Sequence, residues 1–325
     1  MKLPRREFLC LAAGAAGLSS TSRIATAQAY PSRPITMIVP FPAGFPPDTV
    51  GRILAERMRD SLGQPIIIEN GSGADGSIAT GRAARARPDG YTIELGVAST
   101  HVLNSVLYSL PYDVLDDFLP ISPLFTSPFL FVARKTMPAK DLGELIAWLK
   151  ANPDKASTAI VASYLRVAVV LFQRATGTHF VQVPYRGSPV LDLLADHIDL
   201  AILTPTSTIP LVRAGSIKAY AVTSDTRLPL APDIPTFAEM GLPQLSLSYW
   251  GGLFAPRGTS KETIGRLNAA VVEALADPAV RSHILDLGME IFPHEQQTPE
   301  HLAALQKADA EKWWPLIRDL GIRAE

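Results

Sequence analysis

Two short loops hold the residue types best suited to chemistry in this sequence. Loop one (residues 42–49) and loop two (residues 70–77) are rich in glycine and proline, and each follows an apolar run typical of a strand. A loop that leads from a strand into a helix exposes backbone N–H groups that have no partner in the first helical turn, and these groups attract anions. Both loops therefore predict a site for a small anion.

Loop two also fits the spacing of a dinucleotide-binding fingerprint. Gly71, Gly73 and Gly76 follow the G-x-G-x-x-G pattern, and Glu94 stands 18 residues after the last glycine. A turn that brings the backbone close to a small anion needs the same glycines. A dinucleotide-dependent enzyme is therefore an alternative. The export signal described below argues against it, because the signal sends the protein out of the compartment that holds NAD.

Patterns of catalytic and metal-binding residues are missing from the sequence. The chain has no G-x-S-x-G nucleophile elbow, and residues 294–298 have only the first histidine of a zinc-binding helix. The six histidines are scattered, at His101, His179, His197, His283, His294 and His301. Only His101 follows a predicted strand at the ligand end, and we expect it to make structural hydrogen bonds. We therefore expect a protein that is not an enzyme and binds no cofactor or metal.

The first 29 residues have the layout of an export signal. Three basic residues among the first six, an apolar run at 8–18 and a small-x-small motif at 27–29 predict a mature chain that begins at Tyr30. The Arg5-Arg6 pair also resembles a twin-arginine signal. An uncleaved membrane anchor is the alternative, but the apolar run is much shorter than the ~20 residues that span a bilayer.

The mature chain is predicted to lack cysteine and to carry a small negative charge. The whole sequence has 325 residues, and its one cysteine, Cys10, lies in the signal. Removal of residues 1–29 takes away four basic residues and one acidic residue, so the remaining 296 residues have a formal net charge of −4. This composition excludes disulfides and thiolate chemistry, and it shows no electrostatic footprint for nucleic acid. We expect a soluble periplasmic protein.

Strands and helices alternate along the mature chain, whose length fits about two domains of roughly 150 residues. Strands are predicted at 35–39, 65–69, 91–96, 181–184, 198–203 and 217–223, and helices at 49–62, 77–87, 141–151, 189–195, 277–287 and 299–320. A further helix opens at a predicted capping box formed by Thr259 and Glu262. Strands that alternate with helices indicate parallel sheets and the α/β class.

Ordered motifs along the mature chain resemble one protein family. They include Tyr-Pro-Ser-Arg-Pro-Ile at 30–35, Ile-Val-Pro-Phe-Pro-Ala-Gly at 38–44, Leu-Gly-Gln-Pro at 62–65, Pro-Asp-Gly-Tyr-Thr at 88–92, Val-Pro-Tyr-Arg-Gly-Ser at 183–188 and Pro-Asp-Ile-Pro-Thr at 232–236. They are similar to motifs of the Bug family, the periplasmic solute-binding components of tripartite tricarboxylate transporters. The resemblance runs over residues 30–325, which makes it more specific than any single motif.

The resemblance implies a type II periplasmic-binding-protein fold, in which two α/β lobes joined by two crossing segments close on a ligand. Lobe one would comprise residues 30–130 plus 250–325, and lobe two residues 131–249. The implied ligand is a small organic carboxylate held by backbone N–H groups, and the implied partner is a membrane permease, with no nucleic acid. We expect a monomer. A ligand receptor for a sensor kinase is the alternative that the sequence leaves open.

Two segments depart from the pattern of the family. In loop one, Phe45, Pro46 and Pro47 stand where the family has glycines and a threonine, so two N–H donors are lost. Pro47 also fits a simpler role at the start of a helix. Residues 159–166 are apolar where the family has a Ser/Gly-rich loop, and Arg166 takes the place of the usual histidine. Arg166 is either a partner for a distal carboxylate or a solvated helix residue.

The candidate ligand-binding residues come from both loops and from the ends of later strands. They are Gly44, Phe45, Asp48, Ala74, Gly76, Ser77, Ser99, Thr100, Ser163, Arg166, Thr204 and Thr206. We expect Asp48 to cap its helix and order loop one rather than to touch the ligand. The N–H groups of Ala74, Gly76 and Ser77 would face a carboxylate, and the ligand is expected to be less polar than those of most relatives.

Overall fold

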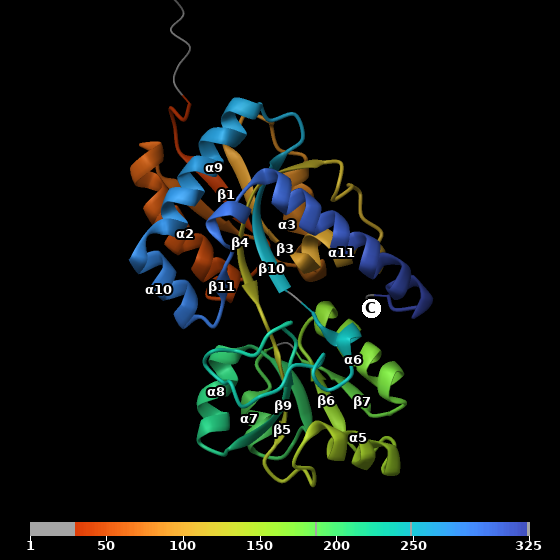
Figure 1. Ribbon diagram of the computed structural model, residues 1–325. Helices are drawn as coiled ribbons and strands as arrows, with labels where there is room; N and C mark the ends of the chain where they lie inside the picture. Colours follow the sequence, from red (N-terminus) through yellow and green to blue (C-terminus); the bar gives the residue numbers. More distant parts are fainter. Residues whose placement is uncertain (1–29, 186, 248, 324–325) are drawn as a thin grey trace, which may run out of the picture.

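Two α/β bodies make up the protein. The computed structural model describes residues 30–185, 187–247 and 249–323. Within these ranges the strands form one six-stranded and one five-stranded sheet, each flanked by helices (Figure 1). We call the part built on the six-stranded sheet lobe one and the part built on the five-stranded sheet lobe two. The α/β class expected from the sequence is confirmed.

The sheet of lobe one has the order β11-β4-β10-β3-β1-β2. Its strands are β1 (Ile35–Val39), β2 (Ile66–Asn70), β3 (Thr92–Val97), β4 (Phe118–Ser127), β10 (Tyr249–Pro256) and β11 (Glu290–Ile291). β1 pairs in parallel with β2 and β3, whereas β10 runs antiparallel to both β3 and β4. The carboxyl ends of β1, β2 and β3 therefore lie at one end of the sheet, the end at which α/β proteins bind ligands.

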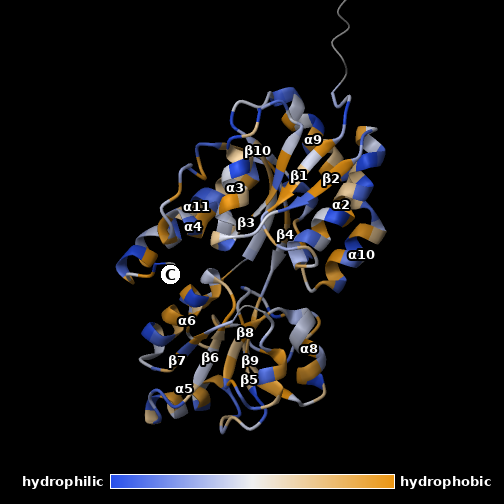
Figure 2. Ribbon diagram, turned by 180° about the vertical axis from the view of Figure 1, so that it is seen from behind, coloured by the Kyte–Doolittle hydropathy of each residue, from blue (hydrophilic) through white to orange (hydrophobic). Residues whose placement is uncertain are grey.

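Helices cover both faces of this sheet. They are α2 (Pro46–Leu62), α3 (Ser77–Ala84), α4 (Asn104–Leu107), α9 (Lys261–Ala276), α10 (Pro278–Asp286) and α11 (Pro299–Asp319), with the short turns η1 (Ala74–Gly76), η2 (Ser99–Leu103) and η4 (His294–Gln296). Side chains alternate along β1: Ile35 and Met37 join the apolar cluster under α2 and α9, and Ile38 joins the cluster under α3 and α11. Polar residues gather on the outward helix faces (Figure 2).

Lobe two repeats this architecture on a smaller sheet, with the order β7-β6-β8-β5-β9. Its elements are β5 (Leu130–Arg134), α5 (Leu142–Ala151), β6 (Ser157–Ile160), α6 (Ser163–Thr176), β7 (Val181–Pro184), α7 (Val190–Leu194), β8 (Leu200–Leu203), α8 (Pro205–Arg213), β9 (Ile217–Val222) and η3 (Pro243–Leu245). β6 pairs in parallel with β7 and β8, and β5 is antiparallel to β8 and β9. The end of β6 and the end of β8 therefore face the same way.

The chain crosses between the lobes along two segments that lie next to each other. Pro128 and Phe129 separate β4 from β5, and the second crossing leads from β9 back to β10. Thr223 joins the two segments, because its Oγ1 accepts from the Phe129 N–H at 2.9 Å and its carbonyl accepts from the Leu247 N–H at 2.9 Å. Figure 1 shows β4 and β10 running from lobe one toward lobe two.

The starts of α2 and α9 differ from the sequence prediction. Helix α2 begins at Pro46 rather than at residue 49, because proline fits the first turn of a helix, where no N–H is needed. Helix α9 is capped by Ser260, whose Oγ accepts from the Thr263 N–H at 3.1 Å. The capping box predicted from Thr259 is therefore wrong by one residue.

The predicted export signal, residues 1–29 with Cys10, lies outside the described residues. In the part of the chain that is described, no helix has both the length and the apolar character needed to cross a bilayer. The His, Asp and Glu side chains of that same part form no group of three that could hold a metal ion.

Candidate ligand-binding site

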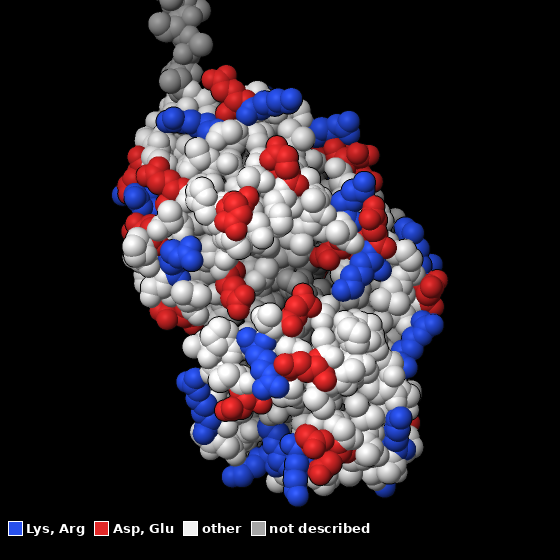
Figure 3. Space-filling view, in the orientation of Figure 1, with Lys and Arg blue, Asp and Glu red and all other residues white. Residues whose placement is uncertain are grey.

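A cavity of about 650 Å³ lies between the two lobes. Lobe one contributes parts of loop one and loop two, and lobe two contributes the start of α6 and the end of β8. Among the described residues that line it, none is lysine, arginine or histidine, and Asp75 is the one acid. The molecule is hollowed where the lobes meet, and charges of both signs are interspersed over the face seen in Figure 3.

Asp48 orders loop one from beneath. Its side chain is 2% exposed, and its Oδ2 accepts from the Gly44 N–H at 2.8 Å and from Arg52 Nε at 3.0 Å. Its Oδ1 accepts from Asn70 Nδ2 at 2.8 Å, which ties loop one to the end of β2. Burial raises the pKa of the Asp48 carboxyl. Together, these hydrogen bonds lower the pKa by more than burial raises it, so it stays below its usual value. Asp48 is thus an ionised support for the loop and not part of the cavity wall.

Loop one presents an apolar surface to the cavity and offers few donors. The Gly44 N–H is taken by Asp48, and the Phe45 N–H donates to the Pro42 carbonyl at 3.3 Å. Pro46 and Pro47, the first two residues of α2, have no N–H. Phe45 is 46% exposed and lines the cavity. The start of α2 therefore has fewer of the N–H donors that usually let a helix N-terminus bind an anion.

Loop two, in contrast to loop one, has several backbone N–H groups that can donate to a ligand. Ala74 and Asp75 have φ of 47° and 50°, a left-handed conformation that non-glycine residues seldom adopt. The N–H groups of Ser72, Gly73, Ala74 and Asp75 have no hydrogen-bond acceptor among the described residues. Successive N–H groups in a tight turn form a concave site for an anion.

The side chain of Asn104 and the absence of one at Gly76 fix the shape of loop two. Asn104 Nδ2 donates to the Asp75 carbonyl at 3.0 Å and to Ser77 Oγ at 2.9 Å. A Cβ at Gly76 would lie 2.8 Å from both the Pro40 carbonyl oxygen and Thr100 Cγ2, at a φ of 89°. Only glycine allows this approach of loop two to the end of β1.

A buried acid and histidine lie behind these loops. Thr80 Oγ1 donates to Glu94 Oε1 at 2.7 Å, and Glu94 Oε2 lies 3.8 Å from His101 Nε2. Burial raises the pKa of Glu94 to about 8 and lowers the pKa of His101 to about 3. Both groups are therefore mainly neutral near pH 7. His101 belongs to η2, whose first residue, Ser99, lines the cavity.

Three aromatic rings form the wall of the cavity at the crossing segments. The rings of Phe129 and Tyr249 have centroids 5.7 Å apart, those of Phe129 and Tyr164 5.8 Å, and those of Tyr164 and Tyr249 5.2 Å. All three residues line the cavity. Burial raises the pKa of both tyrosines above the usual value, so both hydroxyls stay protonated. This wall favours a ligand with an apolar body.

The structure brings some of the sequence-predicted residues together at the cavity and leaves others outside it. Gly44, Phe45, Gly76, Ser99 and Thr204 line the cavity, whereas Asp48, Ala74, Ser77, Thr100, Ser163, Arg166 and Thr206 do not. Thr206 instead donates its hydroxyl proton to the Leu287 carbonyl of lobe one at 3.1 Å. The lobes therefore touch beside the cavity as well as at the crossings.

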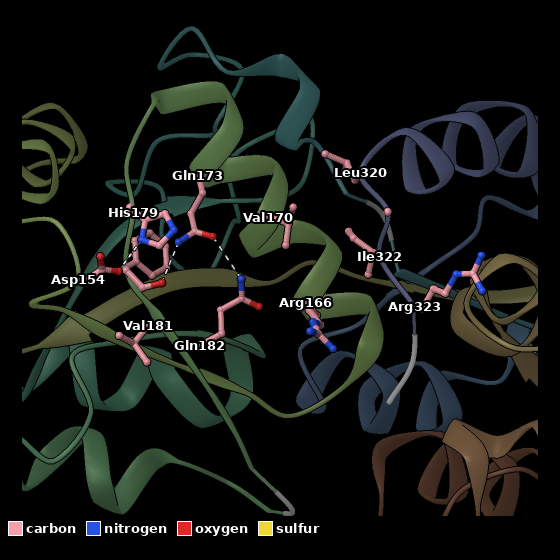
Figure 4. A pocket seen from close by; sticks show the side chains of 12 residues that line it. Asp154, Arg166, Val170, Gln173, His179, Val181, Gln182, Leu320, Ile322 and Arg323 are labelled. Carbon is pink, nitrogen blue, oxygen red and sulfur yellow. Dashed lines mark hydrogen bonds and ion pairs between the residues drawn. The ribbon is translucent and has the colours of Figure 1, made fainter.

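Arg166 lies in a second cavity of about 640 Å³, between α6 and the residues that follow α11 (Figure 4). Here Gln182 Nε2 donates to Gln173 Oε1 at 3.2 Å, and His179 pairs with Asp154. Arg166 is half-buried near the start of α6, and it lines this second cavity rather than the cavity between the lobes.

Sequence reasoning did not select several residues that line the cavity, among them Asp75, Phe129, Tyr164, Tyr249 and Met289. Asp75 carried a usable signal, since a carboxylate inside an anion-binding loop is unexpected. The aromatic residues gave none, because an aromatic residue next to a strand is typical of a core.

Comparison with known proteins agrees with this architecture. Residues 50–322 match the model of the tripartite tricarboxylate transporter family receptor, TctC. Protein BugT of Bordetella pertussis is 34% identical over 92% of this chain and 92% of its own. MatC from Rhodopseudomonas palustris with bound malate is 37% identical, with a TM-score of 0.78 over 89% of this chain and all of that one. A second R. palustris protein, with adipate, is 30% identical, with a TM-score of 0.79 over 90% and 99%.

These matches cover 89% and 90% of this chain and confirm the type II periplasmic-binding-protein architecture expected from the sequence motifs. The family and its solved members are receptors for solutes, so the expectation that the chain is not an enzyme is also confirmed. The chain belongs to the tripartite tricarboxylate transporter receptor (TctC) family, the family of the Bug proteins, and is a solute-binding receptor.

Proposed function

We propose that this protein captures a small organic acid with an apolar body in the periplasm and delivers it to the membrane permease of a tripartite tricarboxylate transporter. The observation that carries the proposal is the cavity between the lobes, where N–H groups of loop two stand without acceptors among the described residues. Such groups bind a carboxylate without a positively charged side chain.

The relatives support a carboxylate as ligand. The two R. palustris proteins similar to this chain bind malate and adipate. Loop one has lost donors to Pro46 and Pro47, and Phe45 and the three aromatic rings supply apolar surface. A ligand of this protein should therefore be less polar than malate.

Each part of the site has its own role in this proposal. The N–H groups of loop two bind the carboxylate, the hydroxyls of Ser99 and Thr204 contact polar atoms of the ligand, and Phe45 packs on its body. Asp48 and Ser77 hold the loops in shape. Residues 1–29 act as an export signal that is removed, which places the mature chain beside the permease.

Thermal unfolding tests this function. Protein recovered from the periplasm of expressing cells is unfolded and refolded to strip bound ligand, and is then melted with carboxylates that range from malate and citrate to benzoate. A ligand at 100 times its Kd stabilises the folded state by about 2.7 kcal/mol, which raises the melting temperature by several degrees. A melting temperature that no acid changes would contradict the proposed function.

A further inference from the structure

The N-terminus of α6 lies at the cavity without a cap of its own. Its N-cap residue is Ala162, whose side chain accepts no hydrogen bond, and Ser163 begins the helix. Ala162 and Tyr164 line the cavity, so this end of the helix faces the ligand side of lobe two. An uncapped helix N-terminus exposes N–H groups and carries partial positive charge, both of which attract a carboxylate.

Asp75 of lobe one lines the same cavity as this helix end. The hydroxyl and the backbone N–H of Ser163 lower the pKa of the Asp75 carboxyl, against burial, which raises it more. Asp75 Oδ2 is buried and has no hydrogen-bond partner among the described residues. The backbone of Asp75 has a φ of 50°, and its carbonyl accepts from Asn104 Nδ2 at 3.0 Å. A carboxylate of the protein therefore lines the cavity together with the anion-attracting end of α6.

Other helix starts around the cavity have lost N–H donors to proline. Helix α2 begins with Pro46 and Pro47, and helix α8 begins with Pro205. The N-cap hydroxyl of α8, on Thr204, already lies 3.2 Å from Ser207 Oγ. Loop two, in contrast, supplies a run of successive N–H groups that have no acceptor among the described residues.

We propose that Asp75 takes the place of a second ligand carboxylate at the start of α6, and so restricts this receptor to acids with a single carboxylate. The inference rests on the proposed function and names the ligand class of the same cavity. A dicarboxylate would bring its distal charge toward Asp75 in a cavity whose described lining has no cationic side chain to offset it.

Three pairs of acids that differ by one carboxylate test the proposal. They are butyrate and succinate, hexanoate and adipate, and 4-methylbenzoate and terephthalate, with Kd measured by calorimetry at pH 8 on stripped full-length mature protein. We expect the monocarboxylate of the best-bound pair to bind about tenfold or more tightly than its dicarboxylate partner. Asp75→Asn, which keeps the size of the side chain and removes its charge, should shrink this ratio by about tenfold or more.

Asp116→Asn is the matched control, because Asp116 is an exposed acid of lobe one outside the cavity and its loss changes the net charge equally. It should leave the ratio unchanged. A wild-type protein that binds the dicarboxylate as tightly as its partner, or an Asp75→Asn variant that keeps the wild-type ratio, overturns the role of Asp75 and leaves the carboxylate function standing. If no acid of any pair binds the wild type, the proposed function and the role of Asp75 both fall.

Discussion

At the residue scale, Glu94 and His101 show how burial sets the charge beneath the site. Thr100 Oγ1 accepts from the Val97 N–H and donates to the Val97 carbonyl, both at 3.1 Å, so its remaining lone pair is available to accept from His101 Nδ1, also at 3.1 Å. The proton of the neutral ring is therefore assigned to Nδ1 and the lone pair of Nε2 faces Glu94. A protonated Glu94 carries an O–H that can face this lone pair, and this agrees with the raised pKa of Glu94.

The pair predicts a specific dependence of stability on pH. Between pH 4.5 and about 8 the folded state keeps a proton on Glu94 that the unfolded chain releases, so stability falls as pH rises. Between about pH 3 and 6.5 the unfolded chain binds a proton on His101 that the folded state excludes, so stability rises with pH. The two effects on stability oppose each other between pH 4.5 and pH 6.5. Between pH 6.5 and pH 8 the free energy of unfolding should fall by on the order of 1–2 kcal/mol.

Urea unfolding of Glu94→Gln at several pH values checks this expectation. Glutamine keeps the acceptor for Thr80 and can donate to His101 Nε2, so the variant should lose the decline between pH 6.5 and 8. Glu69→Gln is the control, because the Glu69 side chain is 49% exposed and its removal should leave the decline in place. A Glu94→Gln variant that declines as the wild type does would show that Glu94 is ionised in the folded state.

At the scale of elements, the start of α2 decides how loop one meets a ligand. Pro46 and Pro47 fix the first turn but remove its donors. Pro47→Ala restores one N–H, so we expect carboxylates to bind roughly tenfold more tightly, the value of a hydrogen bond to a charged group. The same change should lower the free energy of unfolding by about 0.4–1 kcal/mol, because it frees the unfolded chain.

Calorimetry and urea unfolding measure these two effects separately. Pro278→Ala is the matched control, since Pro278 is the first residue of α10 and lies outside the cavity. It should reduce stability by a similar amount and leave affinity unchanged. An unchanged affinity in Pro47→Ala would mean that the ligand carboxylate does not reach the start of α2.

The elements of lobe one were easier to predict from the sequence than those of lobe two. Helix α2 has a clear period of 3.6 residues, β1 is a short apolar run, and glycine or proline marks their ends. Helix α6 was not predicted, because residues 159–166 give one continuous apolar stretch in which β6 ends at Ile160 and the helix begins at Ser163. Such a stretch contains no residue that marks the boundary.

The site was predictable only where backbone chemistry defines it. Glycines and prolines identified loop one and loop two, because these residue types determine which N–H groups are present. Asp75 and the start of α6 are far apart in the sequence, and they line one cavity only because the lobes meet. Residue spacing along the sequence does not predict which distant segments come together at a cavity.

At the scale of the whole molecule, the lobes are held by contacts beside the cavity that ligand binding should reinforce. Thr206 bonds to Leu287 across the lobes, and the crossings meet at Thr223. We expect saturating ligand to favour this closed arrangement and so to reduce the radius of gyration of stripped protein in small-angle X-ray scattering. Identical scattering curves with and without a ligand of measured affinity would contradict closure.

The order of strands in lobe one has a consequence for synthesis on the ribosome. β10 lies between β3 and β4, so these two strands have no partner in common until residue 256 has been made. Lobe two has all the strands of its sheet once residue 222 has been made. Lobe two can therefore complete its sheet before lobe one does. β4 of lobe one pairs with β10, and β10 is translated after every strand of lobe two.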